Sequence, residues 1–233
     1  HPSIYQDHWK EFVAQLSYYQ GWYPGCRAHL WTRYWILERK DCSTETIPVS
    51  TQQSYVPSSI LNWYRQVTIA GDIMFVNKLP FLVTISRNIK FRTAELLQNQ
   101  QHGTILAAIK HVYQLYSKQG FKITTLLMDG QFDGLRGDLA TLGITLNTAS
   151  NDEHVPEIEH HIRTLKERVR SVYTMLPFQR IPTRIIIELI YYSVFWLNSF
   201  PAAGGISDTL SPRTIIVGST IDYAQHCRIE FST

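Results

Sequence analysis

The segment Ile69-Ala70-Gly71-Asp72-Ile73-Met74-Phe75-Val76 is an apolar run that carries one carboxylate. Runs of large and β-branched apolar residues of this length predict a strand buried in a sheet. An ionised side chain inside such a strand costs free energy unless it has a partner. Asp72 therefore marks both the centre of the predicted sheet and the first candidate functional residue.

The sequence around this segment predicts further strands, followed by helices. Short apolar or alternating runs with tight connections predict a meander of three strands, and two more runs follow later in the chain. The five predicted strands cover residues 67–77, 81–87, 89–97, 122–128 and 144–148. Apolar residues at helical spacing predict helices over residues 104–118, 132–142 and 156–176, and a further helix opened by Pro182. This order predicts an α/β fold, a mixed five-stranded sheet with helices on both faces.

The first sixty residues differ from the rest and carry four of the six tryptophans. Residues 43–59 are rich in Ser, Thr, Gln and Pro, which is typical of a linker. We expect an aromatic-rich, unassigned extension and linker over residues 1–60, an α/β core over 61–203 and a C-terminal tail of the core over 204–233. The aromatic residues of the extension fit packing against the core better than stacking on nucleic-acid bases.

The composition is ordinary for a globular protein, with 44% hydrophobic and 18% charged residues. The net charge of +3 excludes a strongly basic chain, so nucleic-acid binding has to be argued from local charge. Residues 73–128 contain a single acid, Glu95, and seven bases: Lys78, Arg87, Lys90, Arg92, Lys110, Lys118 and Lys122. This excess fits a polyanion held nearby, and it fits a solvated basic surface equally well.

The three cysteines are few and far apart: Cys26, Cys42 and Cys227. They predict no disulfide framework and fit a reducing compartment. No zinc site is expected, because His8 and His29 do not stand at zinc-ligand spacing from the first two cysteines.

Three carboxylates stand out by position: Asp72, Asp129 and Glu159. Asp129 follows the run Ile123-Thr124-Thr125-Leu126-Leu127-Met128, and Glu159 lies in the first turn of the helix opened by Pro156. If the two strands are neighbours and the helix packs across them, the carboxylates meet at one end of the sheet. Such a set can hold two divalent ions that act on a phosphodiester, and carboxylate oxygen suits Mg²⁺ and Mn²⁺. Each residue alone is also common as a strand-end, turn or capping residue.

The helix that starts at Pro156 carries bases beside this candidate site. Its apolar residues at 158, 162, 165, 169 and 172 form a stripe for burial. Glu159 is followed on one face by Arg163, Lys166 and Arg170, which places phosphate-binding side chains next to a candidate metal ligand. Glu157 borders the other edge of the apolar stripe, so helical geometry leaves both glutamates open as the third carboxylate.

The segment Glu159-His160-His161-Ile162-Arg163-Thr164-Leu165-Lys166 resembles the Glu-Arg-Lys-Asn-Arg-Thr-Leu stretch of copia-type LTR-retrotransposon integrases. Leu127-Met128-Asp129-Gly130 is similar to the Thr-Asp-Asn-Gly step of that family, and Asp72 matches its first aspartate. Residues 209–226 resemble the Thr-Pro and Gly tail that follows the core, so the resemblance covers residues 67–231. The usual Asn-Gly turn before the glutamate is missing.

The resemblance implies an RNase H-like fold and an integrase that trims DNA ends and joins them to target DNA with a pair of Mg²⁺ or Mn²⁺ ions. It implies Asp72, Asp129 and Glu159 as catalytic and metal-binding residues, and Lys166 as a DNA contact. Two alternatives stay open, since a fold does not fix a function. One is a degraded copy that binds DNA without turnover, and the other is another nuclease of the same fold.

The resemblance also implies partners. These are double-stranded DNA (element ends and target), a homo-oligomer, and a parent polyprotein with an upstream protease and a downstream reverse transcriptase. It implies an intracellular protein that acts in the nucleus after a cytoplasmic particle stage. No membrane partner is expected, because Arg184 and Glu188 interrupt the apolar segment 181–200 and the uncharged part, 189–197, is too short to span a bilayer.

Overall fold

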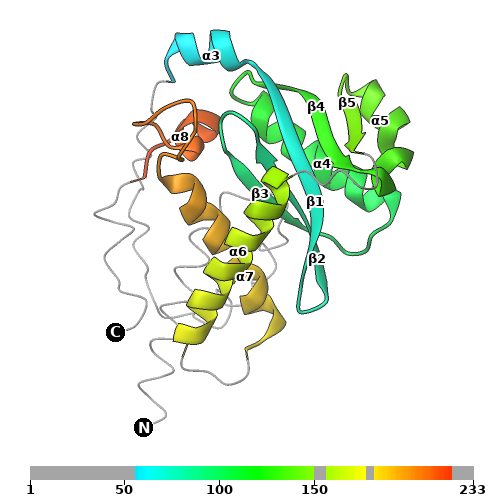
Figure 1. Cartoon of the computed structure of the whole chain (residues 1–233), viewed down its shortest axis with the longest axis vertical. Helices are drawn as coiled ribbons and strands as arrows, with labels where there is room; N and C mark the ends of the chain where they lie inside the picture. Colours follow the sequence, from blue (N-terminus) through cyan, green and yellow to red (C-terminus); the bar gives the residue numbers. More distant parts are fainter. Residues whose placement is uncertain (1–55, 150–155, 177–180, 222–233) are drawn as a thin grey trace, which may run out of the picture. The chain divides into compact units, whose positions relative to one another are not determined.

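A five-stranded sheet in the order β3-β2-β1-β4-β5 forms the centre of the part of the chain that the structure describes (Figure 1). The computed structural model describes residues 56–149, 156–176 and 181–221, which lie in the compact unit Thr51–Thr233. The strands are β1 (Gln66–Val76), β2 (Leu79–Ser86), β3 (Arg92–Leu96), β4 (Lys122–Asp129) and β5 (Thr145–Ala149). The helices are α3 (Ser58–Tyr64), α4 (His102–Ser117), the 3₁₀ helix η1 (Gly130–Leu135), α5 (Arg136–Thr141), α6 (Pro156–Met175), α7 (Thr183–Ser199) and α8 (Pro212–Val217).

Strand β1 is the middle of the sheet and makes it mixed. It pairs antiparallel with β2 and parallel with β4, while β2 pairs antiparallel with β3 and β4 parallel with β5. Asn77 and Lys78 form a two-residue turn between β1 and β2, with φ angles of 48° and 66° that suit the twist of a hairpin. The predicted meander and the predicted mixed sheet are both confirmed.

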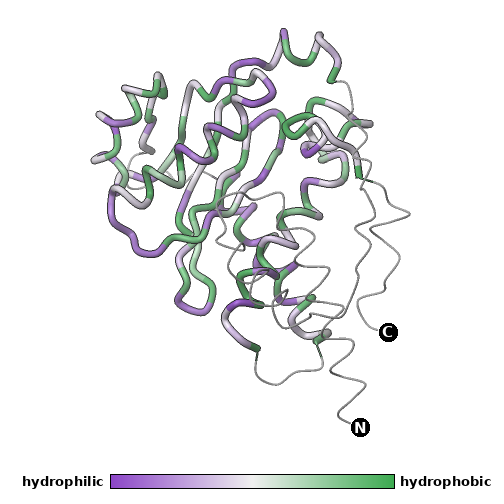
Figure 2. The backbone as a smooth tube through the Cα atoms, turned by 180° about the vertical axis from the view of Figure 1, so that it is seen from behind, coloured by the Kyte–Doolittle hydropathy of each residue, from purple (hydrophilic) through white to green (hydrophobic). Residues whose placement is uncertain are grey.

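Side chains alternate between two helical layers. Val67 and Ile69 of β1 belong to the core cluster that includes Ile109, Val112 and Tyr116 of α4. The opposite face of β1 and β2 contacts α6, and β3 contacts α7. Figure 2 shows the hydrophilic tip of the β1–β2 hairpin standing apart from the hydrophobic strands. Helices therefore cover both faces of the sheet, as the sequence predicts for the RNase H-like fold.

Helix α7 protects the outer strand of the sheet. The Asn198 side chain accepts a hydrogen bond from the backbone N–H of Arg92 at 2.8 Å and donates one to its carbonyl oxygen at 2.7 Å. This amide replaces a missing neighbouring strand at the sheet edge, where open backbone groups favour association with other chains. Among the described helices none is long and apolar enough to cross a membrane.

Several predicted boundaries are wrong. The strand expected over residues 89–97 starts only at Arg92, because residues 87–90 form a turn in which Lys90 has a φ of 62°. Ile89 and Phe91 look like strand residues because both are buried in the core. Helix α3 starts inside the predicted linker, and the expected helix over 132–142 is split between η1 and α5.

Candidate active site

Asp72 and Asp129 lie on neighbouring parallel strands. The register pairs Ala70 of β1 with Leu127 of β4, and two further residues along each strand lead to the two aspartates. Asp129 is the last residue of β4, where the chain turns into η1. Parallel strands bring their carboxyl ends to one edge of a sheet, so the placement expected from the sequence is found here.

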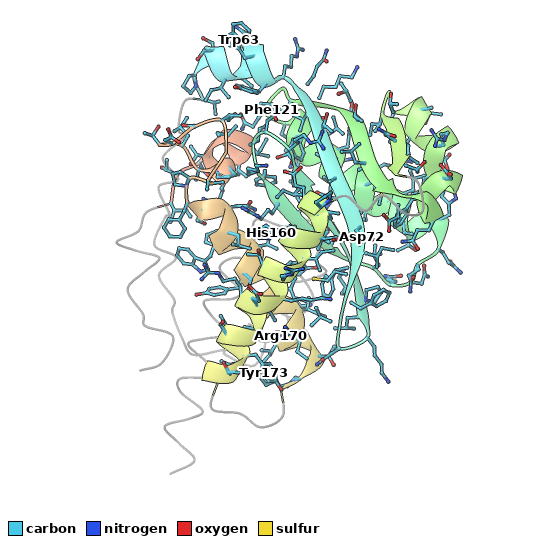
Figure 3. All side chains as sticks on the ribbon, viewed as in Figure 1. Trp63, Asp72, Phe121, His160, Arg170 and Tyr173 are labelled. Atoms are coloured by element: carbon cyan, nitrogen blue, oxygen red, sulfur yellow. The ribbon has the colours of Figure 1, made fainter. Side chains whose placement is uncertain are left out.

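The first turn of α6 brings Glu159 into the same neighbourhood. Helix α6 contacts β1 and β2, and the negative charges of both Asp129 and Glu159 raise the pKa of the half-buried Asp72. Figure 3 shows Asp72 on β1 beside α6, with Arg170 and Tyr173 farther along that helix. The three carboxylates therefore form one electrostatic group, called the acidic group below.

The pKa of Asp72 is raised mainly by burial, and the two neighbouring carboxylates add to the effect. The backbone N–H of Ile73, which donates to Asp72 Oδ1 at 2.6 Å, and the charge of Lys166 act in the opposite direction. Repulsion among the three carboxylates raises this pKa in the same direction as burial, and burial is the larger cause.

The donor chemistry of the acidic group suits a hard cation, since its side chains offer only carboxylate oxygen. In the part of the chain that the structure describes, however, no three His, Cys, Asp or Glu side chains stand close enough together to hold a metal ion. The strands and the helix thus bring the three residues of the acidic group into one region. Their carboxylates, however, do not stand close enough together to form a set of metal ligands.

Glu157 lies two residues before Glu159 and has different partners. Lys90 Nζ donates to Glu157 Oε1 at 2.6 Å, and Arg87 Nε lies 3.6 Å from Glu157 Oε2. Both bases belong to the turn between β2 and β3. Glu157 therefore ties the start of α6 to that turn, whereas Glu159 acts on Asp72. Helical geometry alone could not separate the two glutamates, and these ion pairs do.

The basic face of α6 runs away from the acidic group. Lys166 is half-buried and acts on Asp72, while Arg163 and Arg170 are exposed. Lys166, Arg170 and Tyr173 line a cavity of about 400 Å³ together with the tip of the β1–β2 hairpin. Glu167 forms no ion pair within the described residues, so it does not neutralise this face.

The basic excess over residues 73–128 does not form one surface. Arg87 and Lys90 pair with Glu157. Arg92 is half-buried, and its Nη1 donates to the carbonyl oxygens of Leu197 and Lys90. Three of the seven bases in this run thus have structural partners, which reduces the positive charge that the run offers to a polyanion.

Sequence reasoning missed two polar features near the site. His161 is buried on α6, and neither of its ring nitrogens is hydrogen-bonded to the described residues. Burial, followed by the charge of Arg92, lowers its pKa to about 3. Asp133 accepts from Arg136 Nη2 at 2.6 Å and from Thr148 at 3.1 Å, which joins η1 to β5. Nothing in the residue pattern separates His161 from an exposed histidine. The end of the resembling tail, residues 222–226, lies outside the described part, as do the three cysteines and the first fifty-five residues.

Comparisons with known proteins give similar folds and no family. No family model matches the chain, and no curated protein matches it. The catalytic core domain of BIV integrase is 17% identical, with a TM-score of 0.46, over 70% of this chain and 98% of that one. The HTLV-2 integrase catalytic core domain in complex with magnesium is 13% identical, with a TM-score of 0.47, over 64% and 95%. At such identities and scores, the fold rests on the strand order and register described above.

Proposed function

We propose that this chain is the catalytic core of an integrase, a polynucleotidyl transferase that cuts and joins DNA phosphodiesters with divalent metal ions. One observation supports this most. Asp72 and Asp129 stand level with each other on neighbouring parallel strands, and the first turn of a helix that contacts β1 carries Glu159, whose charge reaches Asp72. Structural carboxylates rarely gather on a buried strand at the cost of a raised pKa.

In this proposal Asp72, Asp129 and Glu159 hold Mg²⁺ or Mn²⁺. The metal pair would activate the attacking hydroxyl and stabilise the leaving oxygen. The raised pKa of Asp72 supports a need for positive charge at this position. Lys166 partly supplies that charge in the metal-free chain, and with Arg163 and Arg170 it offers donors to the phosphates on either side of the reacting one.

The finer assignments rest on the sequence resemblance. We propose a copia-type element, whose polyprotein also contains a protease and a reverse transcriptase. The DNA partner would be the double-stranded element ends and the target, bound by a homo-oligomer in the nucleus. Glu157 is left out of the metal site because Lys90 and Arg87 hold it.

Strand transfer tests the proposal, using a duplex with the element's terminal sequence and a supercoiled target in Mg²⁺ or Mn²⁺. Asp72→Asn, Asp129→Asn and Glu159→Gln should each remove product, while the matched variant Glu157→Gln should keep it. Product from all of the first three variants would contradict the proposed site.

The open ligand set supports a second candidate, a copy that binds DNA without turnover. DNA binding by folded wild-type protein, with no product in either metal, would select it. Loss of DNA binding together with loss of activity would contradict both candidates.

A further inference from the structure

A second cavity, of about 440 Å³, lies among β3, α6 and the C-terminal end of α7. Its volume falls in the range of sites that hold small molecules, roughly 300–1,000 Å³. The lining residues that carry the argument are Arg92, Arg168, Val172, Tyr192, Trp196 and Phe200. No carboxylate lines it, and none of its residues belongs to the acidic group.

Two guanidinium groups face this cavity from different elements. Arg92 is held in place, since its backbone is paired with Asn198 and its Nη1 donates to the Leu197 carbonyl oxygen at 3.0 Å. Its Nη2 makes no hydrogen bond to the described residues. Arg168 is exposed on α6 and has no ion-pair partner in the described part of the chain. The cavity thus presents a fixed and a mobile donor group for an anion.

Aromatic rings also line this cavity. The rings of Trp196 and Phe200 are stacked, with centroids 6.0 Å apart and planes 22° apart. Tyr192 meets Trp196 edge-on, also at 6.0 Å. Phe200 is 51% exposed, so part of its side chain faces solvent.

We propose that this cavity binds a nucleotide unit, with its base against the Trp196 and Phe200 wall and its phosphate between Arg92 and Arg168. The planar guanidinium fork matches phosphate oxygens, and every nucleic-acid base has a face that stacks on aromatic rings. An inorganic anion would leave the aromatic wall unused, and an apolar ligand would leave two guanidinium groups without acceptors. A nucleotide engages both features.

The nucleotide cavity is separate from the acidic group, so the two proposals can fail independently. Arg168 follows Glu159 by nine residues, which is a rotation of about 180° around a helix. The basic face with Lys166 and Arg170 lines the other cavity, on the hairpin side of α6. A ligand between Arg92 and Arg168 would therefore approach α6 from the side opposite Asp72.

Calorimetric titration with adenosine monophosphate tests this inference, alongside adenosine, ribose 5-phosphate and inorganic phosphate. We expect a dissociation constant between about 10 µM and 1 mM for the nucleotide, within the efficiency of small ligands. Adenosine and inorganic phosphate should each bind about tenfold or more weakly, because each lacks one half of the recognised chemistry. In ¹⁵N-tryptophan-labelled protein, the indole resonance that Trp196→Phe removes should shift with the nucleotide.

Arg168→Gln is the decisive variant, because the residue is exposed and its loss should leave the fold intact. It should weaken nucleotide binding about tenfold, while Lys110→Gln, at an exposed base on α4 outside both proposed sites, should leave it unchanged. Equal affinities for adenosine and its monophosphate would overturn the inference, as would equal effects of the two variants. Tighter binding of an acidic aromatic peptide than of the nucleotide would reassign the cavity to a protein partner. If Arg168→Gln keeps strand-transfer activity, its effect on nucleotide binding can be judged independently of the proposed function.

Discussion

The Asp72 carboxyl group is half-buried on β1 beside two other carboxylates, and its pKa is raised above the ordinary 3.8. The folded protein therefore binds this proton more tightly than the unfolded chain does. The resulting stability is fully present below pH 3.8 and is lost as pH rises through the folded pKa. At neutral pH the ionised carboxylate opposes folding. We predict that Asp72→Asn melts at a higher temperature than wild type in EDTA at pH 7.

Asp133→Asn is the matched control for this prediction. Arg136, and then Thr148, lower the pKa of the exposed Asp133 carboxyl, so its contribution is present above the unfolded pKa and is lost as pH falls. This variant should gain no stability at pH 7. A melting temperature of Asp72→Asn below that of wild type would contradict the prediction, because it would show that the surroundings of Asp72 stabilise its ionised carboxylate.

His111 on α4 gives a second pH-dependent effect. Its partner carries the opposite charge, whereas Asp72 lies beside carboxylates of like charge. Its Nδ1 lies 3.0 Å from Glu95 Oε1 of β3, both side chains are mostly buried, and Glu95 raises the pKa of the imidazole above 6.5. The ion pair should contribute on the order of 1 kcal/mol below pH 6.5 and lose it as pH rises through the raised pKa. Urea unfolding of wild type and His111→Gln should therefore differ more at pH 5.5 than at pH 9. A constant difference would contradict a charged pair.

At the scale of elements, long periodic segments could be predicted from the sequence, and their ends could not. Helix α6 begins at Pro156 as expected, because proline suits the first turn and the apolar stripe repeats clearly. The start of β3 was misplaced, since Ile89 and Phe91 are buried by the core without pairing as strand residues. Helix α8 was missed although Ser211 caps it, Pro212 opens it and Gly218 ends it with a φ of 74°. Six residues are too few for a periodic signal.

The basic face of α6 carries a prediction that belongs to the helix as a whole. The charge of Lys166 acts on Asp72, and Glu167 forms no ion pair with the described residues that would neutralise the face. Removing one phosphate contact should reduce the dependence of log binding constant on log salt by about 0.9 for duplex DNA. We predict this change for Lys166→Ala, with similar losses on unrelated duplex sequences.

Lys110→Ala is the control for charge alone. Lys110 is exposed on α4, and its substitution by alanine also removes one positive charge. It should leave the salt slope within error of wild type. The same salt slope for wild type, Lys166→Ala and Lys110→Ala would show that the basic face of α6 is an ordinary solvated surface.

At the scale of the whole molecule, the candidate site could be predicted in outline because its residues stand out against their sequence neighbours. Asp72 is a charge in an apolar strand, and Asp129 ends one. The choice between Glu157 and Glu159 depends on Lys90 and Arg87, about seventy residues earlier in the chain, and no local pattern contains such a contact. The nucleotide cavity was equally invisible, since Arg92, Arg168 and Trp196 come together only when β3, α6 and α7 pack.

Metal binding links the acidic group to the stability of the entire domain. A cation that binds only the folded state stabilises it by about 2.7 kcal/mol at a hundred times its dissociation constant. For a domain of this size that corresponds to roughly 5–10 °C in melting temperature. The carboxylates must approach one another to form a ligand set, which lowers this gain, and relief of the repulsion at Asp72 raises it.

We predict that millimolar Mg²⁺ or Mn²⁺ raises the melting temperature at constant ionic strength. Asp72→Asn, Asp129→Asn and Glu159→Gln should each lose most of the rise, whereas Glu157→Gln and Asp133→Asn should keep it, because Lys90 and Arg136 already hold those carboxylates. An unchanged melting temperature in folded wild-type protein would point to a site that no longer binds metal.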